Sequence, residues 1–151
     1  LAAIKKGVSD ARLEGRIQIL STQPFIVADV AHNVDAANNF YNFISKTKKN
    51  GKVRAIFSIL ENKDIEKVLL PFINIVDEWH VSEINQLRSQ KIDVIVSTIK
   101  KYKKEVIINI FGTLYEAYNN ACKISDPNDN IIIFGSFFTV SEIMNGVKHD
   151  G

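Results

Sequence analysis

The chain has 151 residues and a mass of 17.0 kDa; 46% of its residues are hydrophobic and 24% are charged. A chain of this length buries roughly 70% of the surface that its unfolded form exposes, so one hydrophobic core suffices without metals or disulfides. Lys and Arg number 19 and Asp and Glu number 17, and the resulting net charge of +2 lacks the basic excess of a dedicated nucleic-acid-binding protein. These values predict a single globular domain with no nucleic-acid partner.

The N-terminal third predicts a β-hairpin followed by a helix. Residues 18–20 and 25–30 are rich in β-branched and aromatic residues, and the polar residues 21–24 between them are typical of a turn. Apolar residues then recur at helical spacing over 36–44, with Asn33 as the expected N-cap.

A nearly continuous apolar segment, 53–60, predicts a strand that is covered on both faces. Helical spacing returns over 65–73, with Asn62 or Asp64 as the N-cap. Because a proline inside a helix removes a hydrogen bond and clashes with the preceding turn, Pro71 predicts a kink or an early end.

The second half of the chain continues to alternate strands with helices. Thr139, with Glu142 three residues later, is expected to form a capping box for the last helix. The remaining strands are expected at 78–82, 106–110 and 131–134, and the remaining helices at 92–99, 114–122 and 140–147.

This alternation, with short connections, predicts an α/β fold in which a largely parallel sheet has helices on both faces. The longest apolar runs are far shorter than the roughly 20 residues that cross a bilayer, so no membrane span is expected. Cys122 is the only cysteine, which is consistent with a reducing compartment and favours a cytoplasmic location. The N-terminus begins without Met, and we expect a piece of a longer chain.

Ligands of open α/β sheets bind beyond the carboxyl ends of the strands, and two segments occupy such positions, 29–33 and 135–139. Asp29 could accept hydrogen bonds from ribose hydroxyls or could cap the backbone amides of the next turn. His32 could contact an anion near a helix N-terminus or could serve as a structural hydrogen-bonding residue. Ser136, which follows Gly135, could help to bind a carboxylate, or the two residues could simply form a tight turn.

Other chemistry is not supported by the spacing of residues. The glycines fit neither the dinucleotide-binding pattern nor the P-loop pattern, so a bound nucleotide would need a second domain. His80 and His149 have no partners at metal-ligand spacing, and no metal site is expected. The lysine-rich segments 46–52 and 100–104 are interpreted as solvated helix ends.

Several short motifs together resemble the C-terminal domain of the dihydrofolate synthase/folylpolyglutamate synthase family, within the Mur ligase superfamily. The motif Asp-x-Ala-His-Asn is shared with the wider superfamily, whereas Gly-Ser-Phe-x-Thr-Val is more particular to the folate branch. The matching residues, in chain order, are Gly15-Arg16, Asp29-Val30-Ala31-His32-Asn33, Asn62-Lys63-Asp64 and Gly135-Ser136-Phe137-Phe138-Thr139-Val140.

The resemblance implies a Rossmann-like domain and a role for individual residues. Arg16 would reach an ATP phosphate, and Asp29 would hold the ribose. His32 would be catalytic, beside the incoming glutamate and the acyl phosphate, and Ser136 would help to bind glutamate. Val34 replaces the proline that commonly follows the His-Asn pair in the family, a mild departure.

Two further positions have no assigned role. Phe138 stands where related bacterial enzymes often have a histidine, and Arg88 stands roughly where the family has an arginine before a helix.

The function implied by the resemblance is that of an ATP-dependent ligase that joins L-glutamate to dihydropteroate or tetrahydrofolate through an acyl phosphate. Residues 1–151 would form the glutamate-binding C-terminal domain, while Mg²⁺ and most of the ATP would be bound by an N-terminal P-loop domain of the same polypeptide. The isolated chain is then expected to be inactive. The alternatives are a stand-alone module that binds a nucleotide or carboxylate and a Mur-type ligase domain acting on a cell-wall precursor.

Overall fold

The computed structural model describes residues 17–150, which form a six-stranded sheet with the strand order β1-β2-β6-β3-β4-β5. Only β1 runs antiparallel to its neighbour, and all the other pairs are parallel. The predicted hairpin and the largely parallel α/β sheet are therefore confirmed. The strands are β1 (Gln18–Thr22), β2 (Phe25–Ala28), β3 (Val53–Phe57), β4 (Glu78–Val81), β5 (Ile107–Ile110) and β6 (Asn130–Phe134).

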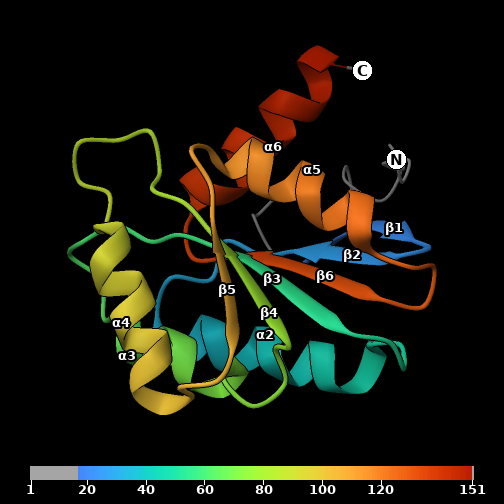
Figure 1. Cartoon of the computed structure of the whole chain (residues 1–151), viewed down its shortest axis with the longest axis horizontal. Coiled ribbons are helices and arrows are strands. Elements are labelled where there is room, and N and C mark those ends of the chain that lie inside the picture. Colours follow the sequence, from blue (N-terminus) through green and yellow to red (C-terminus); the bar gives the residue numbers. More distant parts are fainter. Residues whose placement is uncertain (1–16, 151) are drawn as a thin grey trace.

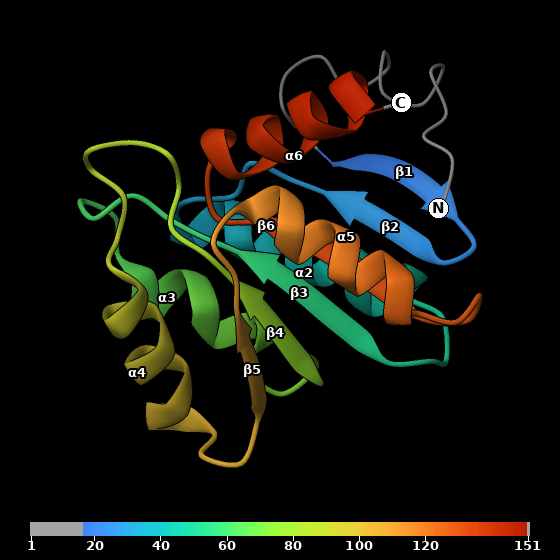
Figure 2. The same cartoon turned by 45° about the horizontal axis from the view of Figure 1, so that its top comes forward.

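Helices cover both faces of the sheet, as predicted (Figures 1 and 2). Three of them, α2 (Val34–Thr47), α3 (Ile65–Leu69) and α4 (Ile92–Tyr102), lie on one face. The other face carries α5 (Leu114–Ile124) and α6 (Phe137–Asp150). Within residues 17–150, none of these helices has the length and apolar character needed to span a membrane.

The starts and ends of two helices follow from single residues. The side chain of Asn33 accepts a hydrogen bond from Ala36 N at 2.9 Å, so its predicted role as the N-cap of α2 is confirmed. Asp64 caps α3, which ends at Leu69, and a short 3₁₀ turn (Leu70–Phe72) carries Pro71. The early end predicted from this proline is also confirmed.

The expected capping box at the last helix is wrong. The helix α6 begins at Phe137, and the Ser136 side chain accepts the hydrogen bond from Thr139 N at 3.0 Å. Since Thr139 already lies in the first turn, its hydroxyl is available to donate to Ser58 O at 2.9 Å. The carboxylate of Glu142 accepts a hydrogen bond from Asn85 N instead.

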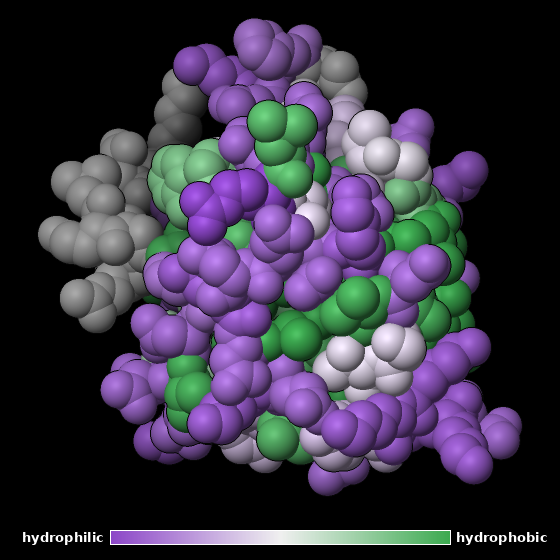
Figure 3. Space-filling model, turned by 90° about the vertical axis from the view of Figure 1, so that its left-hand side faces the viewer, coloured by the Kyte–Doolittle hydropathy of each residue, from purple (hydrophilic) through white to green (hydrophobic). Residues whose placement is uncertain are grey.

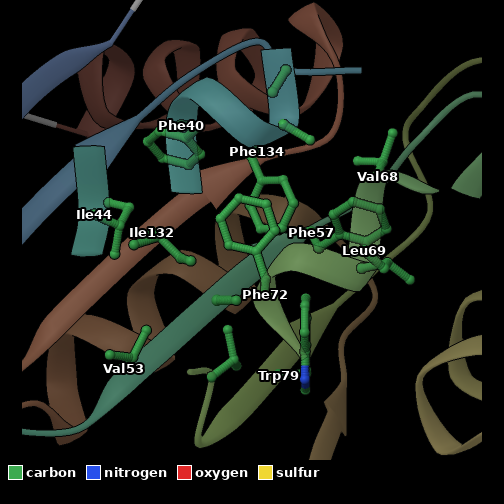
Figure 4. Packing of buried hydrophobic residues seen from close by; sticks show 14 of the residues in the cluster. Phe40, Ile44, Val53, Phe57, Val68, Leu69, Phe72, Trp79, Ile132 and Phe134 are labelled. Atoms are coloured by element: carbon green, nitrogen blue, oxygen red, sulfur yellow. The ribbon is translucent and has the colours of Figure 1, made fainter. Parts of the chain in front are cut away.

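An aromatic cluster fills the core between the sheet and the helices α2 and α3 (Figure 4). The ring centroid of Phe134 lies 4.3 Å from that of Phe72 and 5.0 Å from that of Phe57. Phe40 and Trp79 extend the cluster, and all of these side chains are fully buried. This packing supports β3 and β6 beneath the loops that follow them.

A buried ion-pair network stabilises the end of the sheet at which the parallel strands begin, opposite the loops that follow β3 and β6. Arg54 in β3 donates from Nε to Glu78 Oε1 at 3.0 Å and from Nη1 to Asp129 Oδ2 at 2.8 Å. Because the Arg54 side chain is only 7% exposed, each carboxylate compensates a charge that would otherwise be buried alone. The network joins β3, β4 and the turn before β6 at this edge.

Gly135 allows the chain to pass very close to a neighbouring loop immediately after β6. Its φ is +123°, a conformation that L side chains rarely adopt, and a Cβ atom there would lie 1.9 Å from Ser58 O. Its amide donates to Ala31 O at 3.1 Å. Glycine at this position therefore brings together the loops after β2, β3 and β6.

His80 in β4 is fully buried, and neither of its ring nitrogens has a hydrogen-bond partner among the described residues. Its ring stacks on Phe111, and Nε2 lies 3.7 Å from Glu78 Oε1, beyond hydrogen-bond distance. Burial lowers the pKa of His80 and outweighs the attraction of Glu78 for a proton. The folded state therefore holds this imidazole neutral at a pH where the unfolded chain begins to bind a proton.

Acidification should therefore destabilise the fold through His80. Because the unfolded state binds a proton near pH 6.5 and the folded state only at lower pH, this contribution to stability is complete above pH 6.5 and is lost below it. The free energy of unfolding should fall by up to about 1.4 kcal/mol per pH unit. Urea titrations at several pH values between 7.5 and 5 give the free energy of unfolding as a function of pH. This free energy should fall less steeply with decreasing pH in His80→Leu than in the parent chain, and an equal dependence on pH in the two proteins would contradict this prediction.

Gly135→Ala should destabilise the chain by more than about 2 kcal/mol, because it adds backbone strain and a contact with the Ser58 carbonyl that cannot be relieved locally. Gly112→Ala is the matched control, since its Cβ would meet only the end of the Glu116 side chain, at 3.1 Å. Chemical denaturation measures the free energy of unfolding of both variants. Similar stabilities of the two variants would show that the close approach at Gly135 is not required.

Candidate functional site

The candidate site lies at the carboxyl edge of the sheet, where the helices change faces. Strand β6 leads into α6 on one face, whereas its neighbours β2 and β3 lead into α2 and α3 on the other. Loops on either side of such a switch point diverge and leave a crevice between them. Both segments selected from the sequence, 29–33 and 135–139, lie at this edge.

The first of these loops carries Asp29 and His32. The amide of Asp29 donates to Ile133 O at 3.0 Å, so the backbone continues the β2–β6 pairing by one residue beyond the strand. Asp29 is 9% exposed. Nδ1 of the half-buried His32 lies 3.0 Å from Val30 O. A carbonyl only accepts hydrogen bonds, so Nδ1 carries the proton and Nε2 of the neutral ring is the acceptor.

In the second loop, Ser136 is 3% exposed and its hydroxyl is held by Thr139. The two hydroxyl oxygens lie 3.1 Å apart, and the single proton of the Thr139 hydroxyl is donated to Ser58 O. The proton between the two hydroxyls must therefore come from Ser136. Ser136 Oγ thus caps α6 and can offer a ligand only a lone pair.

Ser58 was missed as part of the site by the sequence reasoning, and Thr139, which lies within the selected segment 135–139, was expected only to cap the last helix. Ser58 interrupts an otherwise apolar run at the end of β3, and this polar residue at a strand end was the available signal. Thr139 is fully buried, and its bond to the Ser58 carbonyl connects two loops that are 81 residues apart in the sequence. No local pattern could indicate that partner.

Beside these loops lies a cavity of about 410 Å³ whose lining includes Lys63, Arg88 and Phe138. Phe138 is half-buried, and Phe137 next to it is 62% exposed. Figure 3 shows the molecule from the left-hand side of Figure 1, where apolar surface in the centre is bordered by hydrophilic side chains. Phe138 and Arg88, which had no assigned role, therefore lie at one cavity.

Arg16, expected at an ATP phosphate, lies outside the described residues 17–150. Among the residues described, no group of three or more His, Cys, Asp and Glu side chains could hold a metal ion.

Nearly the whole chain is similar to known proteins. The family model "Mur ligase, glutamate ligase domain" matches residues 15–137. The dihydrofolate synthase/folylpolyglutamate synthase of Buchnera aphidicola subsp. Acyrthosiphon pisum is 34% identical over 142 residues, which cover 94% of this chain and 34% of the relative. The chain thus spans about a third of the length of such relatives.

Solved structures of the same enzymes share the fold. Escherichia coli FolC in complex with DHPP and ADP superposes with a TM-score of 0.82 at 27% identity, over 90% of this chain and 31% of that one. A bifunctional folylpolyglutamate synthase/dihydrofolate synthase with Mn, AMPPNP and L-glutamate bound superposes with a TM-score of 0.79 at 31% identity. The match covers 89% of this chain and 31% of that one. The resemblance seen in the motifs is confirmed, and the chain belongs to the Mur ligase glutamate ligase domain family.

Proposed function

We propose that this chain is the glutamate-binding C-terminal domain of an ATP-dependent ligase that joins L-glutamate to dihydropteroate or a reduced folate through an acyl phosphate. The hydrogen bond from Gly135 N to Ala31 O carries the proposal, because it brings the superfamily motif of residues 29–33 and the folate-branch motif of residues 135–140 together at one edge. The relatives' names and the structures with adenine nucleotides and L-glutamate agree with this substrate set.

Asp29 would hold the nucleotide ribose. Its carboxylate stands at the end of a buried strand, beside a switch point, where acidic residues of nucleotide-binding folds accept hydrogen bonds from ribose hydroxyls. The ribose would then be fixed relative to β2 and β6, because the Asp29 amide is bonded to Ile133 O.

His32 would accept a proton from the amine of the incoming glutamate. The hydrogen bond to Val30 O fixes the ring and leaves Nε2 with a free lone pair, the form that a general base requires. Loss of this proton makes the amine nucleophilic, and its nitrogen then forms a bond to the acyl carbon as the carbon–oxygen bond to phosphate breaks. The departing phosphate would take the second proton that the nitrogen loses when it becomes an amide.

Ser136 would contact the ammonium side of glutamate. Since its hydroxyl proton is donated to Thr139, Oγ can accept a hydrogen bond from an amine but cannot donate one to a carboxylate. The glutamate carboxylates would then be bound by other donors. This assignment refines the expectation that the Ser136 hydroxyl itself suits a carboxylate.

The N-terminal P-loop domain of the same polypeptide would supply the remaining half of the site. The glycines of this chain form no phosphate-binding loop, and its described residues offer no carboxylate cluster for Mg²⁺. Arg16 would stabilise negative charge on the phosphoryl group during transfer. The isolated chain would be inactive, because positioning and exclusion of water need both halves.

Mixing this chain with the separately produced P-loop domain should give phosphate release that requires ATP, dihydropteroate and L-glutamate together. Asp29→Asn should raise the KM for ATP by about 10- to 100-fold, the effect of losing hydrogen bonds to a charged group. The control Glu105→Gln removes an exposed carboxylate in the turn between α4 and β5.

Three outcomes would contradict this assignment. Ligation by the chain alone would show that no second half-site is needed. Binding of a nucleotide or carboxylate by the chain, with no activity after mixing, would favour a stand-alone binding module. Activity with a cell-wall precursor in place of dihydropteroate would identify a Mur-type substrate.

His32→Asn should lower kcat of the mixture by about 100-fold or more while the KM for ATP stays nearly constant, because general-base catalysis typically contributes factors of that size. Steady-state kinetics with varied L-glutamate separates the two possible roles of His32. An unchanged kcat with a raised KM for glutamate would assign His32 to binding and remove it from proton transfer.

A further inference from the structure

The strand β5 lies at one lateral edge of the sheet, and in the part of the chain that the structure describes no strand pairs with its outer side (Figure 2). Phe111 N donates to Val81 O at 2.9 Å, so the backbone groups of Phe111 point towards β4. Because successive residues of a strand point their N–H and C=O groups in opposite directions, those of Ile108 and Ile110 point outwards. This open side of β5, residues 107–110, can therefore pair with another strand.

The side chains on the open side of β5 lack the features that normally keep an outer strand from pairing. Natural sheets protect such strands with charged side chains, prolines or bulges. Residues 107–110 carry no charge and no proline, yet Ile107 is 51% exposed and Ile110 is 59% exposed. At the other lateral edge, the register of β1 with β2 is broken between Ile19 and Ser21. Of the two outer strands of the described sheet, β5 is therefore the one suited to pairing.

We propose that the open side of β5 pairs with the same strand of a second copy of this chain, in antiparallel orientation about a two-fold axis at Asn109. Two-fold dimers are the commonest oligomers, and both copies contribute the same residues to such an interface. The two sheets would join into one continuous sheet. The proposal goes beyond the ligase assignment and does not rest on it, since β4 lies between β5 and the strands whose loops Gly135 joins.

An axis at Asn109 makes the sequence of β5 complementary to itself. Ile108 of one copy lies opposite Ile110 of the other, and the two residues exchange both backbone hydrogen bonds because both point outwards. In the same register, Ile107 lies opposite Phe111 of the other copy. Apolar side chains therefore meet apolar side chains, and the exposed Ile107 and Ile110 both become covered.

The half-buried Asn109 determines where the axis lies. An amide side chain both donates and accepts hydrogen bonds, so two copies of Asn109 that face each other across the axis can bond to each other. An axis at Ile108 or Ile110 would keep the backbone pairing but place Asn109 opposite an apolar residue. A shift by a single residue would oppose outward-pointing to inward-pointing backbone groups and lose the ladder altogether.

The charges at the two ends of β5 also favour the antiparallel orientation. Residues 100–105, before the strand, contain four lysines and one glutamate. At the other end, Glu83 lines a cavity together with Phe111 and Gly112, and the carboxylate of Glu116 also lies beside Gly112. Antiparallel pairing would place the basic end of each copy next to the acidic end of the other, and this complementarity would occur twice.

Sedimentation velocity of the chain at increasing concentration tests whether the dimer forms. The chain has a mass of 17.0 kDa, and a species of twice that mass should appear reversibly. Because the paired segment is short, the interface lies at the small end for protein complexes, and we expect a Kd on the order of 10–100 µM.

Ile110→Lys should raise this Kd at least about tenfold, because it places a charge within the paired strand. Leu70→Lys is the matched control. It adds the same charge at a residue of similar exposure, 45%, in the 3₁₀ turn after α3, and should leave the Kd unchanged.

Hydrogen exchange of the ¹⁵N-labelled chain, followed by NMR, identifies the residues that pair. The amides of Ile108 and Ile110 should exchange rapidly in dilute solution and become protected as the concentration rises. The amide of Asn109 points towards β4 and should be protected at every concentration, so it is the internal control.

Substitutions of opposite charge at the axis test the symmetry. Asn109→Asp and Asn109→Lys should each remain monomeric, because like charges directly opposite each other destabilise strand pairing. An equimolar mixture of the two variants should form a dimer, because opposite charges then meet. Only a residue that lies opposite its own copy shows this behaviour, and spectra of the separate variants show whether each one is folded.

Several results would overturn the proposal. The chain could stay monomeric at about 500 µM, several times the expected Kd, or its dimer could be unaffected by Ile110→Lys. The mixture of charged variants could fail to associate. Protection of Ile108 and Ile110 only in a complex with the separately produced P-loop domain would assign the open side of β5 to that domain instead. Failure of the ligase assignment is distinguishable, because these measurements contain no substrate.

Discussion

The amide of Gly135 donates to Ala31 O while the Ser58 carbonyl occupies the space where any other residue would have a Cβ atom. This close approach makes three loops from distant parts of the sequence one structural unit. The Thr139 hydroxyl extends the unit by donating to the same Ser58 carbonyl, which in turn determines what the hydroxyl of Ser136 can do. The chemistry proposed for the site thus depends on where this glycine lies.

The rest of the domain keeps that unit in place. Strand β6 lies between β2 and β3, and the aromatic cluster around Phe134 packs beneath the loops on one face. At the other edge of the sheet, the buried network centred on Arg54 joins the starts of the same strands. Since interiors pack as densely as organic crystals, a shift at either end would disturb the loops. The site is therefore positioned by the core rather than by the loops alone.

Much of this could be predicted from the sequence, because it depends on local pattern. Hydrophobic periodicity located the strands and helices, and Asn33 and Pro71 correctly indicated where helices begin or end. The capping box was wrong because Ser136 and Thr139 compete for one helix start, and a contact with Ser58 decides between them. The cavity lined by Lys63, Arg88 and Phe138 was missed for a similar reason, since these residues come from two separate loops and from the first turn of α6. The proposed roles of Asp29, His32 and Ser136 stay predictions.

The most direct measurement is a crystal structure of this chain together with its P-loop domain, a non-hydrolysable ATP analogue and L-glutamate. The account predicts that the Asp29 carboxylate accepts hydrogen bonds from the ribose hydroxyls and that the glutamate amine lies within hydrogen-bond distance of His32 Nε2. A nucleotide bound entirely by the P-loop domain, or a glutamate remote from the loops joined by Gly135, would contradict the assignment of this edge as half of a ligase site.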